Sequence, residues 1–175
     1  MVDQNEIDIP SLEIKLFSED DPISDLTGLI NRAYSQLADL GLKYVGTWQG
    51  DDITRKRIRT AECYVGFLDG RIVATILFRD PATTRGSPWY ERDDVASFGQ
   101  FGVEPDLQGR GVGSAMLSHI ENRAIEKGAA EIALDTAEPA QHLIDWYSRR
   151  GYRFIEYVDW PVTNYRSVIM SKNLT

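Results

Sequence analysis

Apolar residues follow two different periods along the chain. Where they alternate with polar residues, or form short runs of β-branched and aromatic residues, they predict strands. Where they recur every three or four positions, they predict amphipathic helices. The predicted strands lie at residues 12–17, 60–68, 71–79, 95–103, 132–134, 152–158 and 165–171. The predicted helices lie at residues 26–40, 111–127 and 139–150, with a further short helix between residues 42 and 59.

Turn residues separate these elements. The pair Asp69-Gly70 stands between two predicted strands and is a strong hairpin signal. Residues 80–94 contain prolines and a glycine without periodicity, so we expect a long loop there, of the kind that often contacts a ligand. The order β-α-α-β-β-β-α-β-α-β-β predicts the α/β class, as a mixed sheet with helices on its faces.

Length and charge narrow the class of protein. A chain of 175 residues, 42% hydrophobic and 26% charged, is typical of one globular domain, which we place at residues 11–175 after a flexible N-terminus at residues 1–10. Nineteen basic against 27 acidic side chains give a net charge of −8, which argues against generic binding to nucleic acid. Because we find neither a signal-peptide pattern nor a long apolar segment, we expect a cytoplasmic protein without a membrane span.

Metal and disulfide chemistry receive little support from the sequence. Cys63 is the only cysteine and lies in an apolar stretch, which predicts a buried thiol. His119 and His142 are too few and too isolated to build a metal site with it. We therefore expect no metal cofactor.

The segment of residues 103–114 runs from the end of a predicted strand into the start of a predicted helix. It contains three glycines, Gly109, Gly111 and Gly113. The first turn of a helix offers N–H groups without intrahelical partners and the positive end of the macrodipole, and glycine lets a phosphate approach them closely. Arg110 adds a cation that suits phosphate oxygens. The segment therefore predicts a phosphate-binding turn.

Other interpretations of this turn fit less well. A P-loop requires a lysine before its serine or threonine, whereas Gly113 stands directly before Ser114. The dinucleotide fingerprint requires its second and third glycines three positions apart, whereas these glycines are spaced by twos after an antiparallel hairpin. A glycine-rich turn that only packs the helix against the strand is the structural alternative.

The segment resembles the acyl-CoA signature of the GCN5-related N-acetyltransferase (GNAT) family, Gln/Arg-x-x-Gly-x-Gly/Ala between a strand and a helix. Gln108, Gly111 and Gly113 match its three fixed positions. Residues 146–152, Trp-Tyr-Ser-Arg-Arg-Gly-Tyr, resemble a second family segment, in which a helix ends in a glycine before a strand. The resemblance covers nearly the whole chain and implies a single-domain GNAT-like fold, with a mixed, mostly antiparallel sheet of about seven strands and helices on both faces.

The resemblance also implies a reaction. An acetyl group would pass from acetyl-CoA to a primary amine by direct attack through a tetrahedral intermediate. Tyr147 matches the family tyrosine that protonates the departing thiolate as a general acid, and its alternative is a core tyrosine whose hydroxyl binds the backbone. The residues that the resemblance assigns to acetyl-CoA are Phe101, Gly102, Val103, Gln108, Gly109, Arg110, Gly111, Val112, Gly113 and Ser114.

The general base is not fixed by any family motif. Asp135, at the end of a predicted strand, and Glu91, in the long loop, are the two candidates, and for each the alternative is a solvated carboxylate. The cofactor side also departs from the family pattern. Ala140 stands where many members carry an asparagine, so Gln141 or Glu138 could make its contacts instead.

The acceptor pocket is expected in the least regular segments. Aromatic residues there, with aspartates nearby, would suit a cationic amine that also has an apolar part. The aromatic candidates are Trp48, Trp89, Tyr90 and Trp160, and the aspartates are Asp51, Asp52, Asp93 and Asp94. For the aromatic residues, core packing and a subunit interface are the alternatives.

Two functions therefore stay open. The first is an N-acetyltransferase that acts on a primary amine of a small molecule, a peptide or a protein. The second is a non-catalytic sensor or regulatory module that binds acyl-CoA. The resemblance also allows a homodimer, which is common in the family. Neither nucleic acid nor a membrane is expected as a partner.

Overall fold

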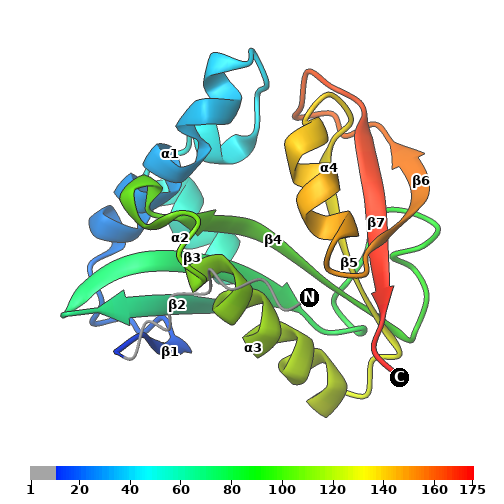
Figure 1. Cartoon of the computed structure of the whole chain (residues 1–175), viewed down its shortest axis with the longest axis horizontal. Coiled ribbons are helices and arrows are strands. Elements are labelled where there is room, and N and C mark those ends of the chain that lie inside the picture. The colour runs from blue at the N-terminus through cyan, green and yellow to red at the C-terminus, as the bar shows by residue number, and fades with distance from the viewer. Residues whose placement is uncertain (1–10) are drawn as a thin grey trace.

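Seven strands form one sheet in the order β1-β2-β3-β4-β5-β7-β6 (Figure 1). The computed structural model describes residues 11–175, and the expected flexible segment 1–10 lies outside the described residues. The strands are β1 (Glu13–Leu16), β2 (Glu62–Leu68), β3 (Arg71–Arg79), β4 (Val95–Val103), β5 (Glu131–Ala137), β6 (Arg153–Val158) and β7 (Ser167–Asn173). The helices are α1 (Ile23–Asp39), α2 (Asp51–Ile58), α3 (Val112–Glu126) and α4 (Gln141–Ser148), with 3₁₀ turns η1 (Val45–Thr47) and η2 (Pro105–Leu107). Only β4 and β5 run parallel, so the prediction of a mixed, mostly antiparallel sheet is confirmed.

The predicted order of elements is confirmed as well, and the differences lie at their ends. β5 runs to Ala137, beyond its predicted end at residue 134, because its polar end pairs with β7. α4 begins at Gln141, so Pro139 precedes the helix instead of standing in its first turn. α1 begins at Ile23, before the first apolar residue of its predicted stripe. Patterns of apolar residues therefore place the elements but do not fix where each element begins and ends.

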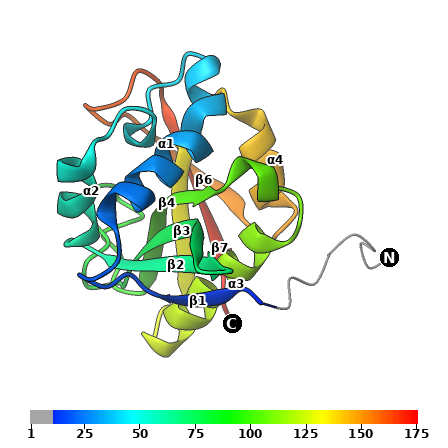
Figure 2. The same ribbon diagram turned by 90° about the vertical axis from the view of Figure 1, so that its left-hand side faces the viewer.

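Helices cover both faces of the sheet (Figures 1 and 2). On one face, Leu26, Leu29 and Ile30 of α1 pack against Leu77 of β3, and α2 lies beside α1. On the other face, α3 and α4 pack against the central strands. Each fully buried leucine or isoleucine contributes about 1.5–3 kcal/mol relative to an exposed one, so these layers hold the central strands in place. Cys63 of β2 lies in the first layer, which confirms the predicted buried thiol.

The Asp69-Gly70 turn between β2 and β3 forms as predicted. Asp69 has φ +50° and Gly70 has φ +77°. Two successive residues in the left-handed region are what a type I′ hairpin turn requires. The hairpin positions Arg79 at the far end of β3, which becomes important for the site.

The sheet opens between β4 and β5. Residues 95–97 pair with residues 131–133, and beyond them the two strands diverge (Figure 1). β4 continues to Val103 and stays paired with β3 on its other side, so the edge that faces β5 has no strand partner there among residues 11–175. Gln100, with φ +45°, lies where the register between β4 and β3 shifts. The opening gives a ligand access to the middle of the sheet.

Candidate active site

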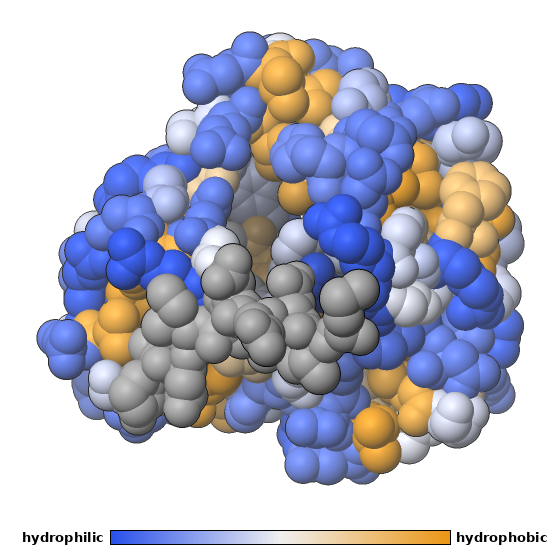
Figure 3. Space-filling view, viewed as in Figure 1, coloured by the Kyte–Doolittle hydropathy of each residue, from blue (hydrophilic) through white to orange (hydrophobic). Residues whose placement is uncertain are grey.

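A cavity of about 970 Å³ occupies the opening between β4 and β5. Its walls come from α1, β4, the start of α3, the end of β5, and α4. Figure 3 shows this face of the molecule hollowed at its centre. The volume lies in the range of sites for small molecules and cofactors. The cavity is therefore the candidate active site.

The glycine turn forms one end of the cavity. Gly109 has φ +74° and Gly111 has φ +90°, and Gly111 is the N-cap of α3 with no side chain capping the helix. A Cβ atom added at Gly109 would meet no other atom within 4 Å, so the space beside this turn is open. The N–H groups at the start of α3 are therefore accessible to an anion. Gln108 ties the turn to β4, because its Nε2 atom donates to the Val103 carbonyl at 3.3 Å.

Most residues assigned to acetyl-CoA come together at this end. The residues of that set that line the cavity are Phe101, Gly102, Val103, Gln108, Gly109, Gly111, Gly113 and Ser114. The structure does not bring the other two side chains there. Val112 is buried in the core that α3 forms with the sheet, and Arg110 is exposed outside the cavity. A cation near the turn comes instead from Arg150, which donates to Ser114 Oγ at 2.9 Å and lies 3.5 Å from the centre of the Trp146 ring.

The position just before α4, where many family members carry an asparagine, is occupied by Ala140 and contributes no polar side chain. Ala140 is fully buried in an apolar cluster with Leu37 and Ala137. Gln141 donates to Asp145 within its own helix, at 2.7 Å. Glu138 pairs with Arg166 on the surface. The expectation that Gln141 or Glu138 makes the contacts of the missing asparagine is therefore not supported by their placement.

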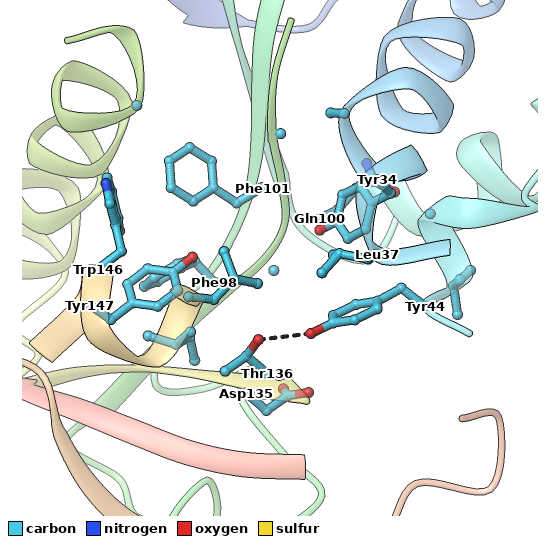
Figure 4. A pocket seen from close by; sticks show the side chains of 18 of the residues that line it. Tyr34, Leu37, Tyr44, Phe98, Gln100, Phe101, Asp135, Thr136, Trp146 and Tyr147 are labelled. Carbon is cyan, nitrogen blue, oxygen red and sulfur yellow. Dashed lines mark hydrogen bonds between the residues drawn. The ribbon is translucent and has the colours of Figure 1, made fainter. Parts of the chain in front are cut away.

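Tyr147 lies on the α4 side of the cavity. Its ring packs among Phe98, Trp146 and Tyr152, and Figure 4 shows its hydroxyl directed into the open space. No hydrogen-bond partner for this hydroxyl occurs among residues 11–175, so the alternative of a backbone-bonded core tyrosine does not describe it. Burial raises the pKa of Tyr147 well above its ordinary value of 10. The phenol therefore stays protonated near neutral pH and can donate a proton.

Asp135 lies at the end of β5 and faces the cavity. Its Oδ1 atom accepts a hydrogen bond from the Tyr90 hydroxyl at 3.0 Å, and its Oδ2 atom accepts one from Trp160 Nε1 at 3.0 Å. Asp135 is exposed through the mouth of the cavity, so its carboxylate is accessible to a ligand there. Burial raises the pKa of Asp135, although both hydrogen bonds and the positive charges of Arg79 and Arg57 oppose the shift. A carboxylate with a raised pKa beside a cavity is suited to act as a general base.

The second candidate base lies elsewhere. Glu91 accepts a hydrogen bond from the Gly86 amide at 3.1 Å and pairs with Arg85 at 3.7 Å. Among the acidic side chains of residues 11–175, Asp135 is the one that lines the cavity. Of the two candidates, the structure thus brings Asp135 to the site and leaves Glu91 on the surface loop.

The four aromatic candidates divide in the same way. Tyr90 and Trp160 line the cavity and stack on each other with ring centres 6.5 Å apart. Trp89 instead packs in the adjacent core, with the Arg92 guanidinium 4.2 Å from its ring centre. Trp48 is half-exposed beside a separate surface hollow. Two of the four therefore contribute to the candidate site.

The aspartates expected beside an acceptor do not line this cavity. Asp51 accepts a hydrogen bond from Ser24, and Asp94 forms a two-pronged ion pair with Arg92, so local partners hold these carboxylates away from the cavity. Asp52 and Asp93 do not line it either. Four arginines do line it, namely Arg57, Arg79, Arg85 and Arg150.

These arginines are the residues that sequence reasoning missed. One signal for Arg79 was available, because it lies two positions after the buried Leu77 on a strand and therefore shares its face. Arg57 ends the basic run Arg55-Lys56-Arg57, and only the fold shows that this last member turns inward.

A bridge of hydrogen bonds closes one side of the cavity. The Tyr44 hydroxyl lies 2.9 Å from Thr136 Oγ1 and accepts a hydrogen bond from the Ala137 amide at 2.8 Å (Figure 4). It links the segment after α1 to the end of β5, across the opening of the sheet. The distance between the two walls is therefore fixed by specific contacts.

Two further observations concern the chain as a whole. Within the described residues, no group of three or more histidine, cysteine, aspartate or glutamate side chains is placed to hold a metal ion. None of the helices in the same residues has the length and hydropathy that crossing a bilayer requires.

Known proteins resemble this chain in sequence and in fold. Residues 28–152 match the family model described as Acetyltransferase (GNAT) family. The chain is 33% identical over 129 residues to S-(2-succino)cysteine N-acetyltransferase of Bacillus subtilis (strain 168), which covers 73% of this chain and 76% of the relative. It is 25% identical over 138 residues to S-alkylcysteine N-acetyltransferase of the same organism, with 74% and 72% covered. The structure of yncA from Salmonella typhimurium with its cofactor acetyl-CoA has a TM-score of 0.68 at 16% identity, covering 94% of this chain and 95% of that one.

Proposed function

Because this chain belongs to the acetyltransferase (GNAT) family, we propose that it transfers the acetyl group of acetyl-CoA to the amine of a small amino acid, with an S-substituted cysteine as the acceptor. The observation that carries the proposal is one cavity with a phosphate-binding turn at one end, Asp135 and arginines at the other, and Tyr147 on its wall. The two relatives named after S-substituted cysteines support this acceptor.

The donor end fits acetyl-CoA. The open space beside Gly109 and the first N–H groups of α3, which no side chain of residues 11–175 caps, suit the pyrophosphate, and Arg150 adds a positive charge there. The edge of β4 at residues 101–103, which pairs with no strand toward β5 within the described part of the chain, suits the amides of the pantetheine arm. Acetyl-CoA supplies an acetyl group activated as a thioester.

Residues of this chain then provide the acid and base chemistry. Asp135 takes a proton from the acceptor ammonium, directly or through water, so that the amine nitrogen can attack the acetyl carbonyl. A backbone amide on the β4 edge stabilises the oxyanion that forms. The new bond joins nitrogen to the acetyl carbon, and the carbon–sulfur bond breaks as Tyr147 gives its proton to the leaving sulfur. The nitrogen then gives up its second proton, which restores the Tyr147 phenol through water. The products are the N-acetylated acceptor and free CoA thiol.

A thiol-release assay tests the proposal. Acetyl-CoA would be offered with S-ethylcysteine, S-(2-succino)cysteine, a polyamine and a peptide with a free N-terminus, and free CoA would be measured. We expect release with the two cysteine derivatives. N-acetyl-S-ethylcysteine is the matched control, since its nitrogen is already acylated. Release with the polyamine or the peptide alone would contradict the proposed acceptor, and acetyl-CoA binding without release for any amine would favour the sensor alternative.

The Tyr147→Phe variant should lower kcat moderately. The phenylalanine keeps the ring packing against Phe98 and Trp146 but removes the proton. Because a thiol has an ordinary pKa near 8.5, its thiolate is a tolerable leaving group, so we expect a loss of about tenfold. Steady-state kinetics with the best acceptor measure this. A variant as fast as the wild type would show that Tyr147 only positions the donor.

The rate should also fall at low pH. Burial raises the pKa of Asp135, and only its deprotonated form can act as a base, so kcat/KM should drop as pH falls through a pKa above the ordinary aspartate value of 3.8. A pH profile of kcat/KM for the acceptor, recorded at constant saturating acetyl-CoA, measures this fall in rate. If Asp135→Asn retained an acid limb of the same midpoint, another group would be responsible.

A further inference from the structure

Two arginines line the end of the cavity where the acceptor is proposed to bind. Neither forms an ion pair with a carboxylate of residues 11–175. Arg57 comes from α2 and Arg79 from the end of β3, and both line the cavity. Arg57 Nη1 donates to Gln49 Oε1 at 2.8 Å, and Arg79 Nη2 donates to Thr60 Oγ1 at 3.3 Å. The chain as a whole nevertheless carries a net charge of −8.

This arrangement is costly for the folded protein unless an anion joins it. Burial lowers the pKa of both guanidinium groups, and the charge of Arg79 lowers the pKa of Arg57 further. The charge of Asp135 opposes these shifts, but no carboxylate of residues 11–175 forms an ion pair with either arginine, and two partly buried like charges left so destabilise a fold. Each guanidinium has five N–H donors in a planar fork, of which the contacts above use one, so most donors are left for a ligand.

Arg57 is held in place from behind. Gln49, which accepts its hydrogen bond, is buried and donates to Thr54 Oγ1 at 2.9 Å and to Gln100 Oε1 at 3.1 Å. Gln100 itself lines the cavity, is 3% exposed, and has an Nε2 atom without a hydrogen-bond partner among the described residues. A ligand oxygen would satisfy this donor. Hydrogen bonds through Gln49 thus connect Gln100, at the irregular position of β4, to Arg57.

Asp135 provides the complementary charge nearby. Its carboxylate accepts hydrogen bonds from two neutral donors, Tyr90 and Trp160, and from no arginine. The positive charges of Arg79 and Arg57 still act on it at longer range. Ser97 and Arg79 are register partners, and Ser97 is also paired with Ala133 on β5, so Arg79 and Asp135 lie on the same face of the sheet. The acceptor end therefore presents two cations and one anion side by side, which is complementary to a zwitterion.

We propose that Arg57 and Arg79 together bind a carboxylate of the acceptor while its amine faces Asp135, so that the enzyme selects amines that carry a carboxylate. The inference rests on the proposed function and deepens it, because it names the residues that distinguish an amino acid from a simple amine. Guanidinium forks suit carboxylates geometrically, and a charge-assisted pair of hydrogen bonds is stronger than a neutral pair.

The test compares an amino acid with its ester. S-ethylcysteine and its methyl ester differ only in the charge of the carboxyl group, and the ester has the more easily deprotonated amine. We expect the wild type to prefer S-ethylcysteine in kcat/KM by about tenfold or more. Arg57→Gln and Arg79→Gln should each raise KM for S-ethylcysteine by a similar factor and leave KM for the ester nearly unchanged. Arg55→Gln is the matched control, because Arg55 lies on the same helix, exposed beside Asp52.

Folding and binding measurements keep the test decisive. Removing one of two unpaired like charges should leave the melting temperature unchanged or higher, whereas a structural arginine would lower it. Calorimetric titration of S-ethylcysteine into the complex with CoA gives the same comparison without turnover. Equal losses for acid and ester in the variants, or no preference in the wild type, would overturn the arginine site while the acetyl transfer stands. A wild type that binds acetyl-CoA but neither binds nor acetylates S-ethylcysteine would overturn the proposed acceptor as well.

Discussion

Replacing Gly111 by valine should abolish measurable binding of acetyl-CoA. Gly111 has φ +90°, in the left-handed region, where a β-branched residue is strained by about 1–3 kcal/mol. As the N-cap of α3, it sets the direction of the first amides of the helix. Any relaxation that relieves the valine turns those amides away from the cavity, so the phosphate-binding contacts should be lost together.

Gly128 provides a matched control for this variant. It lies at the other end of the same helix, has φ +77°, and is not part of the cavity lining. Gly128→Val should therefore lower the melting temperature by a comparable amount but bind acetyl-CoA with wild-type affinity. Isothermal titration of both variants with acetyl-CoA measures the difference. Wild-type affinity in Gly111→Val would show that the glycine turn only packs α3 against β4.

Replacing Asp135 by asparagine should have the largest effect on turnover. Asparagine can still accept hydrogen bonds from Tyr90 or Trp160 but cannot take a proton at neutral pH. General-base catalysis contributes about 10²–10⁴-fold, so we expect kcat/KM for the acceptor to fall by at least about 10²-fold. Affinity for acetyl-CoA should not change. Glu91→Gln is the control, since Glu91 lies on the surface loop, and it should remain fully active.

The same substitution should not weaken the fold. Burial raises the pKa of Asp135 in the native state, so the native state binds this proton more tightly than the unfolded chain does. The contribution of this group to stability is therefore present at pH below the unfolded pKa and is lost as pH rises through the native pKa. At neutral pH, asparagine removes that unfavourable ionisation. A melting temperature for Asp135→Asn that equals or exceeds the wild-type value, combined with lost activity, would separate a catalytic role from a structural one. Activity within a few-fold of wild type would contradict the role of Asp135 as base.

Local patterns determine much of this fold and one end of the site. β3 occupies residues 71–79 as its β-branched and aromatic residues predict, and the Gly109–Gly113 turn joins β4 to α3 as its glycine spacing predicts. These features depend on residues adjacent in sequence. The opening of the sheet beyond residue 97 follows from the divergence of β4 and β5, which no local pattern encodes.

The acceptor end depends on contacts between distant segments. Asp94 looked available in the sequence, but Arg92, two residues earlier, pairs with it. Arg57 and Arg79 are 22 positions apart in the sequence, and only the fold brings both of them to the cavity. The aspartates that the sequence pattern indicated are therefore not in the cavity lining, and arginines are. Burial and the absence of a local partner decide which charges serve the site.

A structure of the enzyme with CoA and S-(2-succino)cysteine tests the central claim most directly, namely that donor and acceptor share the cavity between β4 and β5. The account predicts the pyrophosphate on the amides of residues 109–114, the CoA sulfur beside the Tyr147 hydroxyl, and the acceptor amine facing Asp135. CoA bound on another face of the sheet, or an acceptor amine remote from Asp135, would contradict it.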